Sequence, residues 1–196
     1  MSYFYKEHVQ RVLYKVNKIN KPKFIIGVDG PGGSGKSTFA TELLEFISNV
    51  EIVKMDDFYK PENLRKELNS VSEIGAYFDW RRLEKQLLIP FVENLDIRFQ
   101  KYNWNCDSLN EWQYISKNSN VIVEGVYSTR PEISKYYDLK IWIYCPADVR
   151  LLRGIERDGL EKMELWQNVW MKQENEYLEK YNPISLSDIN INGNNV

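Results

Sequence analysis

The stretch GVDGPGGSGKSTFA, Gly27 to Ala40, places five glycines, a proline and a lysine between two apolar runs. It satisfies the pattern G-x-x-x-x-G-K-[ST], which begins at Gly30 and ends at Lys36 and Ser37. Such a P-loop surrounds the phosphates of ATP with backbone N–H groups, while the lysine reaches the β and γ phosphates and the hydroxyl binds Mg²⁺. The nucleotide-binding residues that this pattern predicts are Gly30, Gly32, Gly33, Ser34, Gly35, Lys36, Ser37 and Thr38.

A second fingerprint overlaps the first. Gly30, Gly32 and Gly35 also satisfy G-x-G-x-x-G, the dinucleotide-binding turn, and two aspartates follow about 20 residues later. This interpretation gives no role to Lys36 and Ser37, whereas the P-loop uses both. A flexible glycine turn is the third alternative, and it explains neither the apolar strand before the turn nor the amphipathic helix after it.

The order of apolar runs predicts the fold class. KFIIGVD has the continuous apolar character of a strand buried on both faces, and the residues after Lys36 have helical spacing. Alternating strands and helices favour an α/β protein, a three-layer P-loop fold with a parallel sheet of about five strands and helices on both faces. The expected strands are 23–29, 51–55, 121–125, 139–145 and 186–191, and the expected helices include 36–50, 81–94, 147–159 and 160–181.

Length and composition limit the class of protein. The chain has 196 residues, 43% of them hydrophobic, which suits one domain over residues 1–196. We expect an accessory N-terminal helix within residues 1–20, with neither a signal peptide nor a membrane span, and a lid and C-terminal helical region at about 146–180.

Net charge and the least frequent residue types limit the kinds of partner and site that the protein is expected to have. A net charge of -2, from 26 basic and 28 acidic residues, predicts a small-molecule partner and neither nucleic acid nor membrane. The two cysteines suit a reducing compartment, so we expect a cytoplasmic protein. His8 is the one histidine, which argues against a histidine metal site or triad. Composition leaves the oligomeric state open, with a homo-oligomer among the alternatives.

Three carboxylates follow predicted strands at the edge where open α/β sheets bind ligands. Asp56 and Asp57 end the second strand in KMDDFYK, and Glu124 ends VIVEG. Phosphoryl transfer to a hydroxyl needs a carboxylate that orients the acceptor and takes its proton, and either aspartate is placed for that. Glu124 is the expected partner of magnesium beside Ser37. Turn, cap and strand-end roles remain the simpler alternatives for all three.

Three arginines repeat at helical spacing after Pro146. Arg150, Arg153 and Arg157 fall at i, i+3 and i+7, so we expect them on one face of a helix. Such a face can close over the transferring phosphate, with Arg153 acting on the reacting group and Arg150 and Arg157 binding the nucleotide. The alternative is a solvated face paired with Asp148 or Glu156.

Together these motifs resemble the uridine kinase family of P-loop kinases, which has the nucleoside monophosphate kinase type of fold. The resemblance covers most of the chain, through GPGGSGKST, DDFY (56–59), YFDW (77–80), VIVEGVY (121–127) and YYDLKIWIYCPADVRLLRGIERDG (136–159). It implies that Asp56 is the general base, that Asp79 holds sugar hydroxyls and that Glu124 serves the metal. It further implies that Tyr59 and Tyr102 line the nucleoside pocket and that Arg153 and Arg157 belong to the lid.

The chain also departs from the family pattern. Asp57 replaces a serine, and we place it with the substrate-binding residues. WRR follows FD where uridine kinases have a histidine-proline pair, and YNWNCDSLNEW around Tyr102 lacks the histidine and arginine that help such enzymes bind a pyrimidine. The chain is similar to a bacterial branch of short, uridine kinase-like proteins. The resemblance therefore implies kinase chemistry and leaves the base open.

The aromatic residues admit two interpretations. Tyr102, Trp104, Trp112 and Tyr114 flank a turn-like NCDS, as in a β-hairpin over the acceptor pocket, where they either stack on a base or cover the hairpin. We assign Trp166, Trp170 and Tyr177 on the C-terminal helix to the core.

The hypothesis that uses most of these residues is an ATP- and Mg²⁺-dependent kinase of a hydroxyl, with the 5′-hydroxyl of a nucleoside such as uridine or cytidine as acceptor. Pantothenate, a ribosylated vitamin or a sugar is the alternative acceptor. A regulatory nucleotide-binding module without kinase activity is the alternative from another class.

Overall fold

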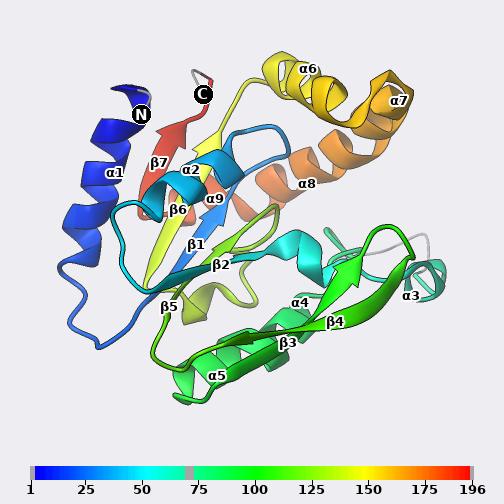
Figure 1. Ribbon diagram of the computed structural model, residues 1–196. Helices are drawn as coiled ribbons and strands as arrows, with labels where there is room; N and C mark the ends of the chain where they lie inside the picture. The colour runs from blue at the N-terminus through cyan, green and yellow to red at the C-terminus, as the bar shows by residue number, and fades with distance from the viewer. Residues whose placement is uncertain (1–2, 69–72, 195–196) are drawn as a thin grey trace.

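The P-loop strand lies at the centre of a parallel five-stranded sheet (Figure 1). The structure is a computed structural model that describes residues 3–68 and 73–194. The strand order is β2-β5-β1-β6-β7, and every neighbouring pair is parallel, which confirms the predicted α/β class. The strands are β1 (Ile25–Asp29), β2 (Val50–Lys54), β5 (Asn120–Glu124), β6 (Leu139–Tyr144) and β7 (Ile189–Asn192).

Helices α1 (Tyr3–Val16) and α2 (Lys36–Leu43) cover one face of the sheet. Alternation along β1 directs Ile26 and Val28 to this face, where they pack with Phe39 of α2. All three side chains are buried, and each contributes about 1.5 to 3 kcal/mol relative to an exposed position. Val9, Val12 and Val16 of α1 belong to the same buried cluster, so the N-terminal helix packs on this layer.

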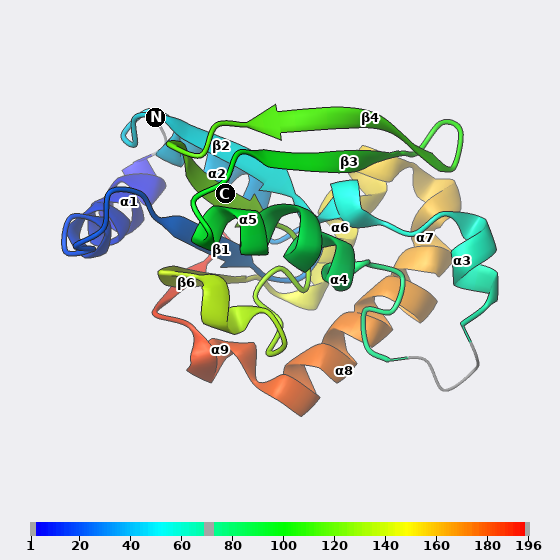
Figure 2. The same cartoon turned by 90° about the horizontal axis from the view of Figure 1, so that it is seen from below.

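The opposite face is covered by one continuous helical segment and by a β-hairpin, seen from below in Figure 2. Ile25 of β1 points to this side and packs with the segment's buried leucines. The helix expected over 81–94 is present as α4 (Trp80–Leu83), a π-helical stretch (Glu84–Leu88) and α5 (Ile89–Val92). The hairpin is formed by β3 (Ile97–Asn103) and β4 (Ser108–Ile115), which confirms the strand pair expected around the NCDS turn.

Short helices connect these layers to the ligand-binding edge. A 3-10 turn (Met55–Phe58) follows β2 directly and carries both predicted aspartates, and another (Ser134–Tyr136) precedes β6. Helix α3 (Glu62–Lys66) lies beside the tip of the hairpin, because the Glu62 N–H donates to the Asp107 carboxylate at 2.9 Å.

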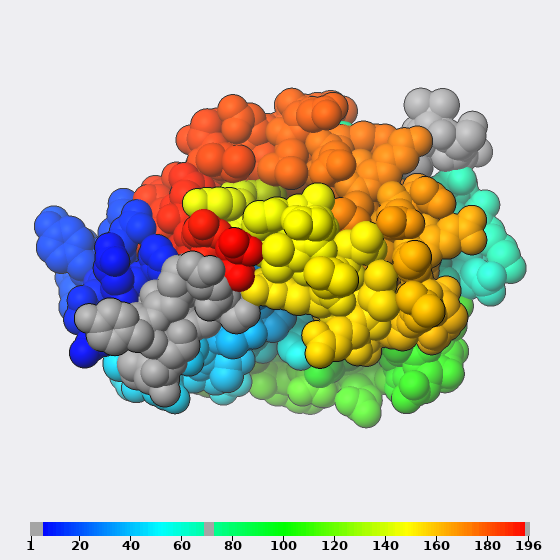
Figure 3. Space-filling view, turned by 90° about the horizontal axis from the view of Figure 1, so that it is seen from above, coloured from blue at the N-terminus to red at the C-terminus, as the bar shows by residue number. Residues whose placement is uncertain are grey.

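The C-terminal third first packs on the P-loop through α6 (Ala147–Asp158) and then on β6 through α8 (Met171–Tyr181). Figure 3 shows α6 in yellow, between the C-terminal residues in red and the following segment in orange. That segment comprises a 3-10 turn (Leu160–Lys162), α7 (Met163–Leu165), a π-helical stretch (Trp166–Trp170), α8 and α9 (Pro183–Leu186). Trp166 and Tyr177 are buried, as expected of core residues, whereas Trp170, which was also assigned to the core, is only half-buried. Within residues 3–68 and 73–194, no helix is long and apolar enough to cross a membrane.

Candidate active site

The glycine-rich stretch forms the turn between β1 and α2 that the sequence predicts. Gly33 has a left-handed backbone with φ of 74°, and a Cβ there would lie 2.7 Å from the carbonyl oxygen of Arg150. Both the conformation and the close packing on α6 therefore require glycine. Lys36 is buried, and its Nζ donates to the carbonyl of Pro31 at 2.9 Å. The ammonium group thus lies inside the loop, where phosphates bind in P-loop proteins.

The other loop residues have different exposures. Ser34 is fully buried, and within the part of the chain that the structure describes its hydroxyl has no hydrogen-bond partner. Ser37 and Thr38 are exposed in the first turn of α2. Ser37 and Thr38 therefore lie at the solvent-exposed start of the helix, where its dipole favours anions.

Ser37 and Glu124 lie side by side at the carboxyl ends of the strands. The Ser37 hydroxyl donates to Glu124 Oε1 at 3.0 Å. Burial raises the pKa of Glu124, while Lys36 and the hydrogen bond from Ser37 oppose that rise. A hydroxyl and a carboxylate are hard oxygen donors, and Mg²⁺ commonly takes one or two protein ligands together with substrate phosphates and water. The pair therefore fits magnesium.

Asp56 lies on the 3-10 turn after β2, open to solvent on one side and crowded by protein on the other. This crowding raises the pKa of Asp56, and the positive charges of Lys36, Arg157 and Lys54 lower it. The fold thus brings the Asp56 carboxylate within the electrostatic influence of Lys36 in the P-loop and of Arg157 on α6. Lys54 was not among the predicted residues, although its register opposite Glu124 at the end of β2 places it here.

Asp57 points elsewhere. Its Oδ1 lies 3.6 Å from Lys101 Nζ on β3, and burial raises its pKa while Lys101 lowers it. The two neighbouring aspartates therefore have different partners: Asp56 faces the P-loop, and Asp57 faces the hairpin.

Aromatic rings gather where the hairpin tip meets the turn after Asp57. The ring of Tyr59 lies 4.6 Å from Trp104 and 5.4 Å from Tyr102, measured between centroids. The Arg65 guanidinium lies over the Tyr59 ring at 4.9 Å. Burial raises the pKa of Tyr59 to about 12, so its hydroxyl stays protonated at neutral pH. The two predicted pocket tyrosines are thus in contact, and Arg65 is an addition that the sequence analysis missed.

Asp79 caps helix α4 on the same side of the molecule. Its Oδ1 accepts the Arg82 N–H at 3.0 Å, and its own N–H donates to the carbonyl of Phe58 at 2.7 Å. The Arg82 Nη2 donates to the backbone carbonyl of Asp57 at 3.0 Å. These bonds hold Asp79 beside the turn that bears Asp56 and Asp57, and the second carboxylate oxygen, 3.8 Å from Arg82 Nε, remains near that guanidinium.

The three arginines of the predicted lid have separate surroundings. Arg150 is buried, and it donates to Glu174 Oε2 at 2.7 Å and to the Cys145 carbonyl at 3.1 Å. Arg153 donates to the carbonyl oxygens of Gly33 at 3.2 Å and of Gly193 at 2.8 Å. These contacts fix the backbone around the P-loop.

Arg157 lies near Asp56 and Glu124. Its guanidinium pairs with Asp158 at 2.7 Å and lies 5.7 Å from the centre of the Trp166 ring. Its charge acts on Asp56 and on Glu124. The structure therefore brings Arg157, rather than all three arginines, to the site, because Glu174 and the backbone carbonyls hold Arg150 and Arg153.

Comparison with known proteins agrees with this geometry. The model of the phosphoribulokinase / uridine kinase family matches residues 25–171. A uridine kinase from Deinococcus deserti is 26% identical over 171 residues, which cover 84% of this chain and 80% of the relative. A uridine kinase from Borrelia duttonii is 33% identical over 138 residues, which cover 68% and 66%. The chain described as a possible uridine kinase from Bacillus stearothermophilus has the same fold, with a TM-score of 0.73, 21% identity, and coverage of 95% of this chain and 98% of that one.

Proposed function

Because this chain belongs to the phosphoribulokinase / uridine kinase family, we propose that it is an ATP-dependent kinase that phosphorylates the 5′-hydroxyl of a nucleoside such as uridine or cytidine. The observation that carries the proposal is the placement of Asp56 within the electrostatic reach of Lys36 and Arg157, next to the Ser37 and Glu124 pair. A base, two cations and a metal-binding pair at one sheet edge are the parts that phosphoryl transfer needs.

The transfer involves one proton and two P–O bonds. Asp56 accepts the proton of the acceptor hydroxyl as that oxygen forms a bond to the γ-phosphorus. The bond from the γ-phosphorus to the bridging oxygen breaks, and ADP leaves with that electron pair. Lys36 and Arg157 offset the negative charge on the phosphate oxygens, a role in which one arginine contributes roughly 10³ to 10⁵ in rate.

Magnesium and the nucleotide would be held by the P-loop and β5. Ser37 and Glu124 would bind the ion, whose charge neutralises phosphate oxygens when it is bound. The loop residues from Gly33 to Thr38 would supply backbone N–H groups to the phosphates, whereas the N–H groups of Gly30 and Gly32 are held by Asp29 and Glu174. Arg150 and Arg153 support this loop through Glu174 and the Gly33 carbonyl, so their contribution to nucleotide binding is made through the backbone.

The acceptor would lie between Asp56 and the aromatic cluster. Asp79 would accept hydrogen bonds from the sugar hydroxyls, and Asp57 stands beside it. Tyr59 and Tyr102, with Trp104 from the hairpin tip, offer ring faces against which a planar base stacks. No histidine lies near Tyr102 in the sequence, so base selection would rely on other groups. Arg65 and Asp107, an ion pair of 3.3 Å, contact Tyr59 and Tyr102 and are available for it.

The proposal is tested by ADP release from Mg·ATP in the presence of nucleosides, pantothenate, ribosylated vitamins and sugars. We expect a nucleoside to stimulate release and to be converted to its 5′-phosphate, with no conversion by a Lys36→Ala variant. Stimulation by a vitamin or sugar alone would change the acceptor. A slow rate that no acceptor increases would contradict the kinase proposal and favour the regulatory module.

A further inference from the structure

Two side chains of helix α8, Glu174 and Tyr177, reach the P-loop from the far end of the chain. They lie one turn apart on one face of the helix, with 5% and 2% of their surfaces exposed. Glu174 accepts the N–H of Gly32 in the P-loop, and Tyr177 donates to Asp29, the residue before the loop. Neither contact follows from the motifs that define the family resemblance, and both residues lie outside the phosphate-binding pattern.

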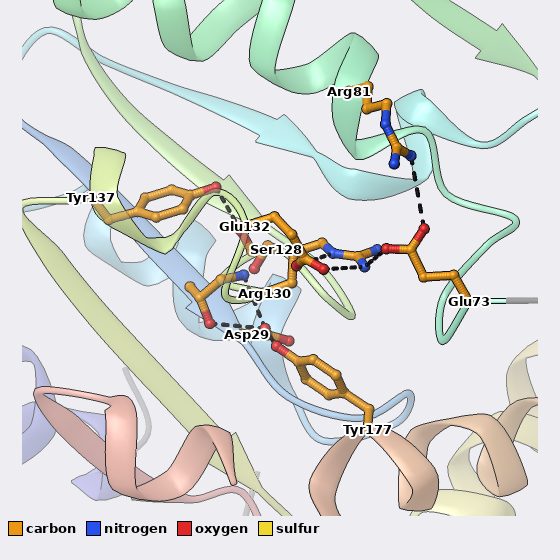
Figure 4. Close-up of polar contacts among 9 residues, drawn as sticks. Asp29, Glu73, Arg81, Ser128, Arg130, Glu132, Tyr137 and Tyr177 are labelled. Atoms are coloured by element: carbon orange, nitrogen blue, oxygen red, sulfur yellow. Dashed lines mark hydrogen bonds and ion pairs between the residues drawn. The ribbon is translucent and has the colours of Figure 1, made fainter. Parts of the chain in front are cut away.

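Tyr177 acts on Asp29, the last residue of β1. The Tyr177 hydroxyl donates to Asp29 Oδ2 at 3.0 Å (Figure 4). The same fully buried carboxylate accepts the N–H groups of Gly30 at 2.7 Å and of Tyr127 and Thr129 at 3.0 Å, together with the Thr129 hydroxyl at 2.9 Å. Five donors around one carboxylate compensate for the loss of water that its burial entails.

Asp29 joins the two loops that carry the reacting groups. Gly30 begins the P-loop, and Tyr127 lies three residues after Glu124. Tyr127 has a left-handed backbone with φ of 67°, a conformation that costs free energy in a residue with a side chain, and its N–H is held by Asp29 at 3.0 Å. Its ring packs against that of Tyr177 with 4.9 Å between centroids. Tyr177 therefore supports both the carboxylate and the strained loop.

Glu174 holds the same turn on its other side. Its Oε1 accepts the Gly32 N–H at 2.8 Å, and its Oε2 accepts from Arg150 at 2.7 Å. Burial raises the pKa of Glu174, and the Gly32 N–H and the positive charges of Arg150 and Lys36 oppose that rise. Because Arg150 also donates to the Cys145 carbonyl, the carboxylate has a fixed position from which it binds Gly32.

The turn that Tyr177 and Glu174 hold also contacts Lys36, the lysine expected to face the phosphates. Pro31 lies between Gly30 and Gly32, and its carbonyl accepts from Lys36 Nζ at 2.9 Å. We propose that Tyr177 and Glu174 are positioning residues of the nucleotide site: they fix Gly30 to Gly32 from one helix and thereby set where the Lys36 ammonium lies. This inference rests on the proposed function, because it takes the P-loop to bind ATP.

The test measures Mg·ATP binding by isothermal titration calorimetry, without an acceptor. Tyr177→Phe keeps the ring and removes the hydrogen bond to Asp29. Tyr181→Phe is the matched control, since its ring packs on Tyr177 but, among residues 3–68 and 73–194, its hydroxyl has no hydrogen-bond partner. We expect Tyr177→Phe to weaken ATP binding about 5- to 10-fold, in the range of coupling between distinct sites. Tyr181→Phe should bind as the wild type does.

A second pair of variants keeps the test decisive where Tyr177→Phe does not fold. Glu174→Gln directs an amide toward Gly32 and Arg150, which are both donors, whereas Glu176→Gln changes an exposed carboxylate of the same helix. We expect the first to weaken ATP binding about 5-fold or more and the second to leave it unchanged.

Thermal midpoints separate positioning from mere structure. If Tyr177→Phe and Glu174→Gln lower the unfolding midpoint but bind Mg·ATP with wild-type affinity, both residues are structural only and the inference is wrong. If the wild type itself does not bind Mg·ATP, the proposed function fails as well. Wild-type binding with unaffected variants therefore overturns the inference alone.

Discussion

Asp56 combines solvent access with a raised pKa and with cations on the side of the P-loop. Asp57, its neighbour, is turned to Lys101. In the proposed mechanism this difference in orientation decides which of the two aspartates takes the proton, since a base must face the hydroxyl that approaches the γ-phosphate.

We therefore expect Asp56→Asn to lower kcat about 10²- to 10⁴-fold, the range that general base catalysis contributes, while Mg·ATP binding stays nearly intact. Asp57→Asn should cause a smaller loss, seen mainly in the KM of the acceptor. Steady-state ADP release and calorimetric ATP binding measure the two effects. An Asp56→Asn variant with wild-type turnover would show that Asp56 is not the base.

The raised pKa values predict an acid limb in the pH profile. Asp56 must be deprotonated to accept a proton, so kcat/KM should fall as the pH drops through its pKa, which crowding by protein raises above the ordinary value of about 4. Burial shifts Glu124 in the same direction, and protons compete with magnesium there. In pH–rate profiles measured at increasing Mg²⁺, the loss of rate caused by protonation of Glu124 should disappear, and the loss caused by protonation of Asp56 should remain. A profile flat down to pH 4 would contradict this assignment.

Among single residues, the sequence predicts the positions of those that lie at or just after the end of a strand. Lys36, Ser37 and Glu124 come together because parallel strands end at one edge of the sheet. The surroundings of Arg150 could not be predicted, since helical spacing gives the direction of a side chain but not the element that it meets. Its partner Glu174 is 24 residues away and belongs to a different helix.

Among the elements, the hairpin has two aromatic surfaces with different neighbours. At its tip Trp104 lies on Tyr59, and along β4 Trp112 lies under the Arg98 guanidinium at 4.2 Å. Tyr102 and Arg65 both bind Asp107 in the turn, which connects the tip to α3. The tip therefore faces Tyr59 and α3, the side that the proposal assigns to the acceptor, while Trp112 faces its own strand pair.

This difference predicts separate effects of two similar substitutions. Trp104→Ala should raise the KM of a nucleoside acceptor about 10-fold, because stacking of a base on an aromatic ring is worth about 1 to 3 kcal/mol, and should leave the KM of ATP unchanged. Trp112→Ala, the control on the same hairpin, should change neither. Initial-rate kinetics with each substrate varied in turn measure both constants. Equal effects of the two variants would mean that the hairpin acts through its stability and not through contact with the base.

The elements themselves were predicted better than their internal regularity. Apolar periodicity identifies the helix over 81–94, but the pattern does not reveal the π-helical stretch at Glu84–Leu88. Pro90 has no N–H to donate to the carbonyl of Gln86, so the α-helical ladder is interrupted there. The hairpin turn was predictable because short polar residues separate two aromatic-rich runs.

At the scale of the whole molecule, nucleotide binding should raise the free energy of unfolding. A ligand that binds only the folded state stabilises it by about 2.7 kcal/mol at 100 times its Kd, which corresponds to roughly 5 to 10 °C in Tm for a chain of this size. We expect this rise with Mg·ATP in differential scanning calorimetry. Lys36→Ala should lose most of it, and Lys15→Ala, on the exposed side of α1, should keep it. An unchanged wild-type Tm at saturating Mg·ATP would contradict the proposed donor.

The contact between Trp166 and the P-loop has an optical consequence. Its indole ring is 2% exposed, and a Cβ at Gly32 would lie 2.8 Å from Cη2 of that ring. The indole N–H donates to Asp158, the residue paired with Arg157, at 3.0 Å. A natural fluorophore therefore adjoins both the loop and the end of α6, so arrival and departure of the nucleotide can be timed by stopped-flow emission without attaching a dye.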